Sequence, residues 1–208
     1  MTESLLLYLL FSLTTLRLLT HLKPQTVTSF TRETLVKLKE IVDSIIWAGM
    51  IALLVIHFVV RSFYIPSESM QPTLDVNDFI LVNELIYNFT APQRGDIIVF
   101  HPTSAHTGDN ADLIKRVVGI ENDKIELKDG SLFLNDIKIQ EEFVLDPINS
   151  DYSAVVVQKD HVFVMGDNRN NSRDSRYIGQ IPLHNVTGRA ELVFYPLKRW
   201  RSFHFPKG

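Results

Sequence analysis

The chain has 208 residues and no cysteine; 45% of its residues are hydrophobic and 22% are charged. This length suits one domain plus some membrane-associated sequence, and the lack of cysteine excludes disulfides, thiolate zinc sites and cysteine-protease chemistry. A formal net charge of −3 leaves no basic footprint for nucleic acid, so we expect no nucleic-acid partner.

Two apolar segments lie in the first 60 residues. Leu5–Leu16 is short for a membrane span. Because Glu3 precedes it and no small-x-small site follows, we interpret it as a retained first anchor rather than a cleaved signal peptide. Residues 41–61, which include the apolar run Ile45–Val60, are long enough for a transmembrane helix. A buried helix of a soluble domain is the alternative, but such helices usually carry a polar face that this run lacks.

Basic residues are unevenly distributed around the second apolar segment. Residues 61–90 hold only Arg61, whereas residues 17–40 hold several lysines and arginines: Arg17, Lys23, Arg32, Lys37 and Lys39. Basic loops stay on the cytoplasmic side of a membrane. We therefore predict three parts: a first anchor with a cytoplasmic loop (1–40), a transmembrane helix in contact with lipid (41–61), and an extracytoplasmic domain (62–208).

The third part reads as a β-rich domain, because short β-type runs alternate with turn residues. Asp129-Gly130, between two such runs, predicts a tight hairpin, and residues 103–112 read as a surface loop. Many short strands favour a mainly β fold, an antiparallel barrel or sandwich. The predicted strands are Phe79–Val82, Ile97–Phe100, Leu113–Val118, Lys124–Leu127, Ser131–Leu134, Ala154–Val157, His161–Met165 and Ala190–Tyr195.

The first motif, Ile65–Leu74, holds Ser67 and Ser69 between two prolines. Proline fixes its own φ and removes a backbone donor, so the serines should lie on a stiff, non-helical turn. Taken alone, the motif could be a juxtamembrane linker. A second motif, Arg94–Phe100, is by itself an ordinary turn leading into a buried strand.

The third motif, Ile114–Gly119, contains a lysine with apolar neighbours. Side chains alternate along a strand, so Lys115 shares a face with Leu113 and Val117. A strand lysine is usually solvated. If this face is buried, desolvation lowers the lysine pKa, and a neutral amine is what a serine hydroxyl needs as general base.

The fourth motif, Met165–Arg176, is dense in Asp, Arg and Asn. Asp167 and Asp174 could each pair with an arginine within the motif or with Arg116 outside it. Composition alone is equally typical of a solvated loop. Other catalytic layouts are missing: the sequence has no Gly-x-Ser-x-Gly, Ser-x-x-Lys or His-Glu-x-x-His motif, and its scattered histidines receive no role.

Taken together, in this order and behind an apolar segment, the four motifs resemble the type I signal peptidases over roughly residues 41–195. These enzymes remove signal peptides from exported proteins and have a β-rich domain with a hydrophobic, membrane-facing surface. The resemblance implies that Ser69 is the nucleophile and Lys115 the general base. It also implies that Ser67 Oγ and the Ser69 amide bind the oxyanion and that Ser172 orients the lysine amine.

The same resemblance implies site-bracing ion pairs of Asp167 with Arg116 and of Asp174 with Arg176. It implies specificity for small residues one and three positions before the cut, and neither metal nor cofactor. Expected partners are signal peptides and membrane lipid, with the secretion translocase as a functional associate, at a bacterial inner membrane. Candidate walls of the substrate pockets are apolar: Ile65, Pro66, Met70, Leu74 and Ile114.

Departures from the family pattern are small. Glu68 stands between the two serines where many relatives have a small residue, and Asn170 stands where relatives often have Asp. Three alternatives stay open at this point: a specialised maturation protease, a self-cleaving Ser–Lys protease, and a non-enzymatic, membrane-tethered β domain that binds partners. The sequence also does not separate a bacterial membrane from an organellar one.

Overall fold

The computed structural model describes residues 12, 15, 37, 39–52, 60–102, 111–144 and 146–203, and it divides into two compact units, Met1–Val59 and Val60–Gly208. Most of the predicted first anchor and of the predicted loop at 103–112 lies outside the described residues.

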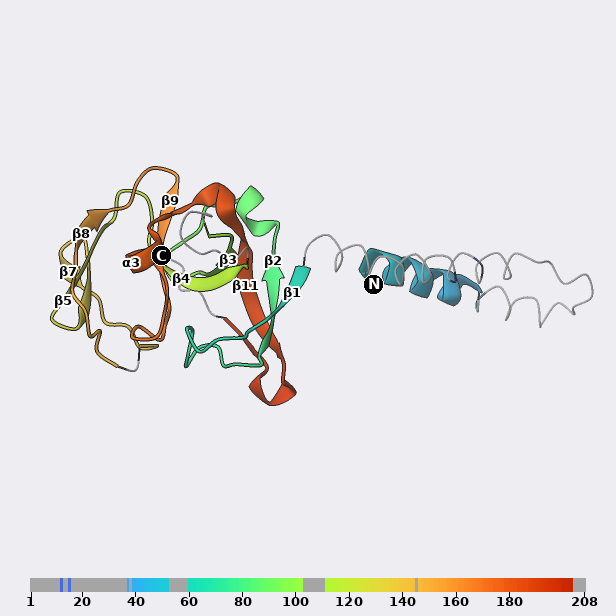
Figure 1. Cartoon of the computed structure of the whole chain (residues 1–208). Coiled ribbons are helices and arrows are strands. Elements are labelled where there is room, and N and C mark those ends of the chain that lie inside the picture. Colours follow the sequence, from blue (N-terminus) through green and yellow to red (C-terminus); the bar gives the residue numbers. More distant parts are fainter. Residues whose placement is uncertain are drawn as a thin grey trace, which may run out of the picture. The chain divides into compact units, whose positions relative to one another are not determined.

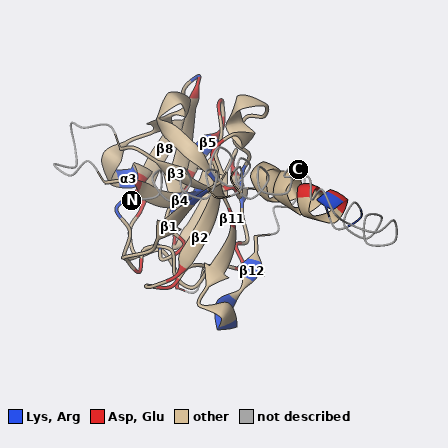
Figure 2. Cartoon of the chain, turned by 90° about the vertical axis from the view of Figure 1, so that its right-hand side faces the viewer, with Lys and Arg blue, Asp and Glu red and all other residues tan. Residues whose placement is uncertain are grey.

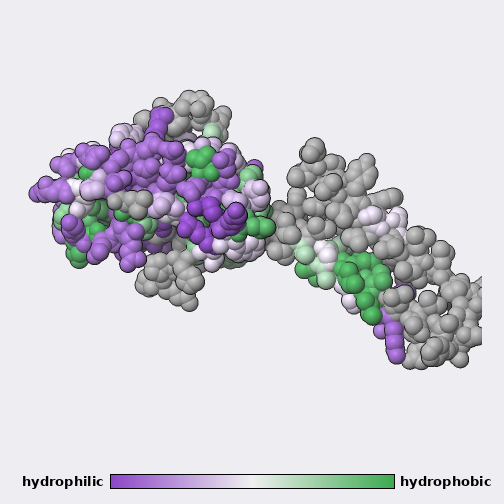
Figure 3. All heavy atoms as spheres, turned by 90° about the horizontal axis from the view of Figure 1, so that it is seen from below, coloured by the Kyte–Doolittle hydropathy of each residue, from purple (hydrophilic) through white to green (hydrophobic). Residues whose placement is uncertain are grey.

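In the first unit, residues 39–52 are helical, and several apolar side chains on this helix are exposed, whereas Ile46 is buried. The exposed ones include Ile41, Ile45, Trp47 and Ile51. Figure 3 shows a green, hydrophobic surface on this segment. Among the described residues there is no helix with the length and apolar character needed to cross a membrane. The helix predicted over residues 41–61 does not reach its expected end, because Val60 and Arg61 belong to a strand.

The second unit is built of antiparallel strands, which confirms the mainly β prediction for this part of the chain. One sheet has the order β1-β2-β11-β3-β4-β9-β10, with β12 paired to β11. Its strands are β1 (Val60–Tyr64), β2 (Phe79–Asn83), β3 (Ile97–Phe100), β4 (Leu113–Gly119), β9 (His161–Met165), β10 (Ile181–Pro182), β11 (Val186–Tyr195) and β12 (Arg201–Ser202).

The second sheet has the order β7-β6-β5-β8: β5 (Lys124–Lys128), β6 (Ser131–Leu134), β7 (Ile137–Lys138) and β8 (Tyr152–Val156). In Figure 1 it lies at one end of the domain, with β1 and β2 at the other and β4 and β9 between them. The predicted hairpin at Asp129-Gly130 joins β5 to β6, and both residues have positive φ (48° and 72°) as a tight two-residue turn requires.

Strand β3 shows why the larger sheet can position a buried site. All of its residues are buried, because alternate side chains enter two different apolar clusters. Ile97 and Val99 pack in the cluster that holds Met70, whereas Ile98 and Phe100 pack in another. A strand covered on both faces reads as a continuous apolar run, as the sequence Ile-Ile-Val-Phe does. Figure 2 shows many of the charged residues in turns and near strand ends.

Short helices complete the domain. The α-helix α3 (Ser175–Ile178) follows the fourth sequence motif and begins at Asp174, whose side chain accepts a hydrogen bond from the Arg176 amide. Three 3₁₀ turns lie between strands: η1 (Ile86–Asn88), η2 (Leu183–Asn185) and η3 (Leu197–Arg199). A carboxylate at a helix N-cap is a favoured arrangement, so α3 fixes the end of the motif that precedes it.

Candidate active site

The turn that carries Ser69 is anchored on both sides. Met70 and Leu74 are fully buried in the core, and the Leu74 amide donates to the Met70 carbonyl oxygen (2.8 Å). At the start of the segment, the Ile65 amide donates to the carbonyl oxygen of Asp78 (2.9 Å). The predicted stiff turn therefore presents Ser69 next to the core, with only 8% of the residue exposed.

A serine hydroxyl and a lysine amine meet in this buried place. Lys115 Nζ donates to Ser69 Oγ at 2.8 Å and to the Ile114 carbonyl oxygen, also at 2.8 Å. Lys115 is 3% exposed, on strand β4. The two residues are far apart in sequence, and the antiparallel pairing of β3 with β4 places the lysine strand in the sheet centre.

Burial changes the chemistry of this amine. Desolvation lowers the pKa of Lys115 from 10.5 to about 8, although the carboxylates of Asp174 and Asp167 act in the opposite direction. With a pKa of about 8, about a tenth of the amine is neutral at pH 7. A neutral amine 2.8 Å from a hydroxyl can accept its proton.

Two further serines predicted for the site lie close to it. Ser67 Oγ is 3.3 Å from Ser69 Oγ, and Ser67 is exposed, so its hydroxyl is accessible beside the nucleophile candidate. Ser172 Oγ is buried and has no hydrogen-bond partner among the described residues. It lies against Gly166, where an added methyl group would overlap both Ser172 Oγ and the Ser69 carbonyl oxygen. The orienting role of Ser172 stays a prediction.

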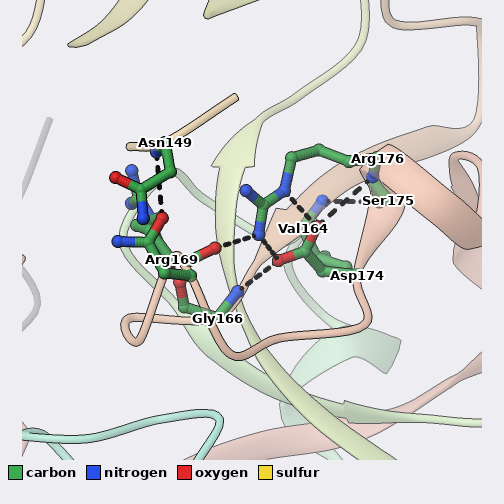
Figure 4. A network of polar contacts seen from close by, with 8 residues as sticks. Asn149, Val164, Gly166, Arg169, Asp174, Ser175 and Arg176 are labelled. Atoms are coloured by element: carbon green, nitrogen blue, oxygen red, sulfur yellow. Dashed lines mark hydrogen bonds and ion pairs between the residues drawn. The ribbon is translucent and has the colours of Figure 1, made fainter. Parts of the chain in front are cut away.

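The structure shows which arginine pairs with each of Asp167 and Asp174, a question that the sequence left open. Asp167 accepts two hydrogen bonds from Arg116, from Nε at 2.8 Å and from Nη2 at 2.6 Å. Asp174 pairs with Arg176, again through two nitrogens (2.8 and 2.9 Å), and also accepts the Gly166 amide at 3.0 Å (Figure 4). Both carboxylates are buried. Bidentate pairs of this kind fix the direction of the backbone between them.

The apolar residues predicted for the substrate pockets separate into two groups. Ile65, Met70 and Leu74 are at most 1% exposed and belong to one core cluster, against which Ile114 packs. Pro66 is exposed. A polar cavity of about 160 Å³ lies between the nucleophile turn and the fourth motif, lined by Gln71, Asp146, Asp167, Asn168, Arg169 and Asn170.

Sequence reasoning missed a segment that packs against the fourth motif. Glu141 forms a bidentate ion pair with Arg169 (2.5 and 2.7 Å), and the Phe143 ring lies 3.9 Å from the Arg116 guanidinium carbon. Asn149 donates its amide to Asn170 Oδ1 at 3.0 Å (Figure 4). We call the described residues 141–144 and 146–149 the strap. Its irregular sequence carries no periodic signal that could have predicted these long-range contacts.

Asn168 was also missed. Its amide donates to the Ser69 carbonyl oxygen (3.1 Å), and its side-chain Nδ2 donates to the Glu68 carbonyl oxygen (3.2 Å). The fourth motif thus contacts the nucleophile turn through backbone groups. Contacts to backbone groups cannot be predicted from residue types. The one available signal is that asparagine side chains often hydrogen-bond to the backbone in turns.

A serine hydroxyl hydrogen-bonded to a buried lysine amine is the arrangement expected of a serine hydrolase that uses lysine as its base. Comparison with known proteins agrees with this class: residues 38–195 match the family model described as signal peptidase, peptidase S26. The chain belongs to this family.

Three relatives illustrate the similarity. The chain is 42% identical to signal peptidase I of Leptolyngbya laminosa over 154 residues, which cover 72% of this chain and 76% of the relative. It is 41% identical to probable signal peptidase I-1 of Synechocystis over 167 residues, 78% of this chain and 85% of the relative. Thylakoidal processing peptidase 1 of Arabidopsis thaliana is 39% identical over 64% of this chain and 41% of its own length.

Proposed function

We propose that this protein is a serine endopeptidase that removes N-terminal signal peptides from exported preproteins, with Ser69 as nucleophile and Lys115 as general base. Membership of the signal peptidase family supports the reaction. The observation that supports the two residue roles is the 2.8 Å contact between Lys115 Nζ and Ser69 Oγ in a site where the amine is desolvated.

In this mechanism, neutral Lys115 takes the proton of Ser69 Oγ while the oxygen attacks the scissile carbonyl carbon. The oxyanion that forms accepts hydrogen bonds from Ser67 Oγ and from the Ser69 amide. The lysine ammonium then gives its proton to the leaving amine as the C–N bond breaks. Water attacks the resulting ester with the same lysine as base, which releases the signal peptide and restores the serine.

The surrounding polar residues serve to hold this pair. We assign the ion pairs of Arg116 with Asp167 and of Asp174 with Arg176 a bracing role, because each joins the fourth motif to the sheet or closes the motif on itself. Ser172, whose buried Oγ lies over Gly166, is proposed to orient the lysine amine when substrate is bound.

Substrate selection is proposed to favour small residues one and three positions before the cut. Pro66 and Ile114 are the accessible candidates for the pocket walls, since one is exposed and the other half-buried. The fully buried group of Ile65, Met70 and Leu74 would support these walls from behind.

We further propose that the protein is membrane-anchored, with the domain from Val60 onward outside the cytoplasm and residues 1–40 providing a first apolar anchor and a basic cytoplasmic loop. Exposed apolar side chains on the helix at 39–52, such as Ile45 at 65% exposure, support lipid as their surroundings. The excess of Lys and Arg in residues 17–40 supports the orientation. A bacterial inner membrane, and association with the secretion translocase, complete the proposal.

The test uses the detergent-solubilised full chain, a preprotein substrate and N-terminal sequencing of the product. Ser69→Ala and Lys115→Ala should each abolish cleavage, because they remove the nucleophile and the base. Ser62→Ala and Lys128→Ala are matched controls, since both residues are exposed in strands outside the site. Cleavage at the wild-type rate by either site variant would reject the Ser–Lys assignment.

A further inference from the structure

Asn168 contacts two consecutive residues of the nucleophile turn. Its backbone N–H donates to the Ser69 carbonyl oxygen at 3.1 Å, and its Nδ2 donates to the Glu68 carbonyl oxygen at 3.2 Å. The second contact is the informative one. The Glu68 carbonyl belongs to the peptide group whose N–H is that of Ser69.

A peptide group is planar, and in the trans form its C=O and N–H point in opposite directions. The Glu68–Ser69 peptide bond is trans. The Glu68 carbonyl oxygen accepts from Asn168 Nδ2 at 3.2 Å and also from the Gln71 amide at 3.0 Å. Donors that fix the direction of this C=O also fix the direction of the Ser69 N–H, and Asn168 supplies the one that comes from a side chain. Hydrogen bonding at the carbonyl also polarises the group, which makes its N–H a stronger donor.

We propose that the Asn168 side chain is a positioning residue for the oxyanion site: it aims the Ser69 N–H at the oxyanion of the tetrahedral intermediate. The inference rests on the proposed function, since it concerns the same reaction. Asn168 itself touches no reacting atom in this scheme. It acts through the Glu68 carbonyl, on the side of the peptide group opposite to the N–H.

Asn168 can do this because its own backbone is held from both sides. Asp167 before it is locked by the bidentate contact with Arg116, and Arg169 after it donates Nε to the Gly166 carbonyl oxygen at 3.0 Å. The Asn171 amide also donates to the Asn168 carbonyl oxygen at 3.1 Å. Figure 4 shows Gly166 and Arg169 in the neighbouring network around Asp174 and Arg176. A donor on such a rigid base needs no reorganisation during the reaction.

A neighbouring contact provides a matched control. Asn171 Nδ2 lies 3.4 Å from the Glu68 carboxylate, so it holds the side chain of Glu68 and not the peptide group. Asn171 is exposed. Asn171→Ala removes an asparagine from the same motif, and a contact to the same residue, but leaves the Ser69 N–H aimed by Asn168.

The experiment measures kcat, KM and their pH dependence for Asn168→Ala, Asn168→Asp and Asn171→Ala in the full-length, detergent-solubilised chain. Losing an oxyanion donor costs about 10²–10³ in kcat, and misdirecting one costs less. We expect kcat to fall about 10- to 100-fold for Asn168→Ala, with KM changed by no more than about twofold. Asn168→Asp keeps the shape but replaces the donor with an acceptor, so its kcat should fall at least as far. Asn171→Ala should stay within about twofold of wild type.

The acid limb of the kcat profile distinguishes this role from a structural one. In both Asn168 variants the limb should stay where the wild type has it, because Lys115 remains buried. A limb displaced towards 10.5 would mean that the motif has loosened and exposed the lysine, and it would overturn the proposal. Wild-type kcat in both Asn168 variants would overturn it too, while loss of cleavage in Ser69→Ala would leave the proposed function intact.

Discussion

Lys115 is buried without a carboxylate in direct contact. Among the described residues its amine bonds two neutral oxygens, the Ser69 hydroxyl and the Ile114 carbonyl. The carboxylates that raise its pKa, Asp174 and Asp167, are each already paired with an arginine. Desolvation therefore dominates, and the site favours the uncharged amine that a general base must be.

This arrangement predicts the pH dependence of cleavage. Only the neutral amine accepts the Ser69 proton, so kcat/KM should rise with pH along an acid limb with an apparent pKa of about 8. Well below that pH the rate should fall about tenfold per pH unit. Initial rates with a preprotein between pH 5 and 10 measure the limb. A limb near 10.5 would show a solvated lysine instead.

Burying the amine should also lower stability. Below pH 8 Lys115 is protonated in the folded protein, although its buried surroundings disfavour the charged amine. The lowering of its pKa from 10.5 to about 8 corresponds to a loss of about 3 kcal/mol in the free energy of unfolding. Lys115→Met should therefore be inactive yet raise the free energy of unfolding by up to about 3 kcal/mol at pH 7. Urea titration followed by tryptophan fluorescence measures this difference.

Repeating the urea titration at higher pH checks the direction in which this stability difference changes. Between pH 8 and 10.5 the unfolded lysine still binds a proton that the folded one has lost, so wild-type stability rises and the advantage of Lys115→Met shrinks. Lys128→Met, at an exposed site on β5, is the matched control for replacing a lysine by methionine. A constant difference at every pH would contradict the desolvation account.

At the residue scale, the sequence indicated that Ser69 and Lys115 could meet in a buried site, and the structure places them in contact, but the sequence did not predict all of their surroundings. Strand alternation around Lys115 and the prolines around Ser69 are local signals, and both residues lie where these signals imply. The partner of Asp167 could not be chosen, since several arginines lie within reach in sequence. Asn168 acts on a backbone carbonyl, which no residue pattern records.

At the scale of elements, the strap joins the smaller sheet to the candidate active site. It runs between β7 and β8. It contacts the fourth motif by an ion pair and by a hydrogen bond from a backbone amide to the Asn170 side chain, and it contacts Arg116 of the third motif by a cation–π interaction. Arg169 is the centre of this junction, because its guanidinium is fully buried between Glu141 and the Gly166 carbonyl. The strap thereby restrains the residues on either side of Asn168.

Glu141→Ala should therefore be strongly destabilising. Removing one partner of a buried ion pair leaves an uncompensated charge and costs about 3–5 kcal/mol. The variant should lose that much free energy of unfolding, and kcat should fall with it because the fourth motif loosens. Glu142→Ala, next in sequence but exposed, is the matched control. Equal stability of the two variants would show that Arg169 finds another partner.

Strands were predictable where the sequence alternates or runs apolar between turns, as in β3, β6 and β9. Strand β1 was not predicted, because Val60 is the last residue of an apolar run that is typical of a helix. Its pairing with β2 is a long-range contact that periodicity does not report. The strap was missed for the same reason: its order comes from Arg116 and Arg169, which are distant in sequence.

At the scale of the whole molecule, the division into Met1–Val59 and Val60–Gly208 assigns every described residue of the candidate site to one unit. The apolar clusters around β3, β5 and β9 lie within that unit as well. The chemistry and the core are therefore built from the same sheets. In the proposed function we expect the first unit to serve for attachment, because it exposes apolar side chains such as Ile45 and Ile51.

It follows that a chain beginning at Val60 should fold and cleave a short synthetic signal peptide at close to the full-length rate. We expect the full chain to sediment with lipid vesicles and this truncated chain to stay in solution, because the apolar helix is gone. A second truncation beginning at Ile65 is the sharper comparison. It also removes β1, whose Phe63 packs against the core and whose Tyr64 ring lies 5.3 Å from Phe79.

The two truncations differ by five residues that pair along the whole length of β2, so the shorter chain should lose both this ladder and the packing of Phe63. Thermal unfolding should show a melting temperature close to wild type for the chain from Val60 and a clear fall for the chain from Ile65. If the melting temperature of the chain from Val60 fell as far as that of the chain from Ile65, the catalytic unit would need residues before Val60. The boundary between attachment and catalysis would then lie within the first 59 residues rather than at the start of β1.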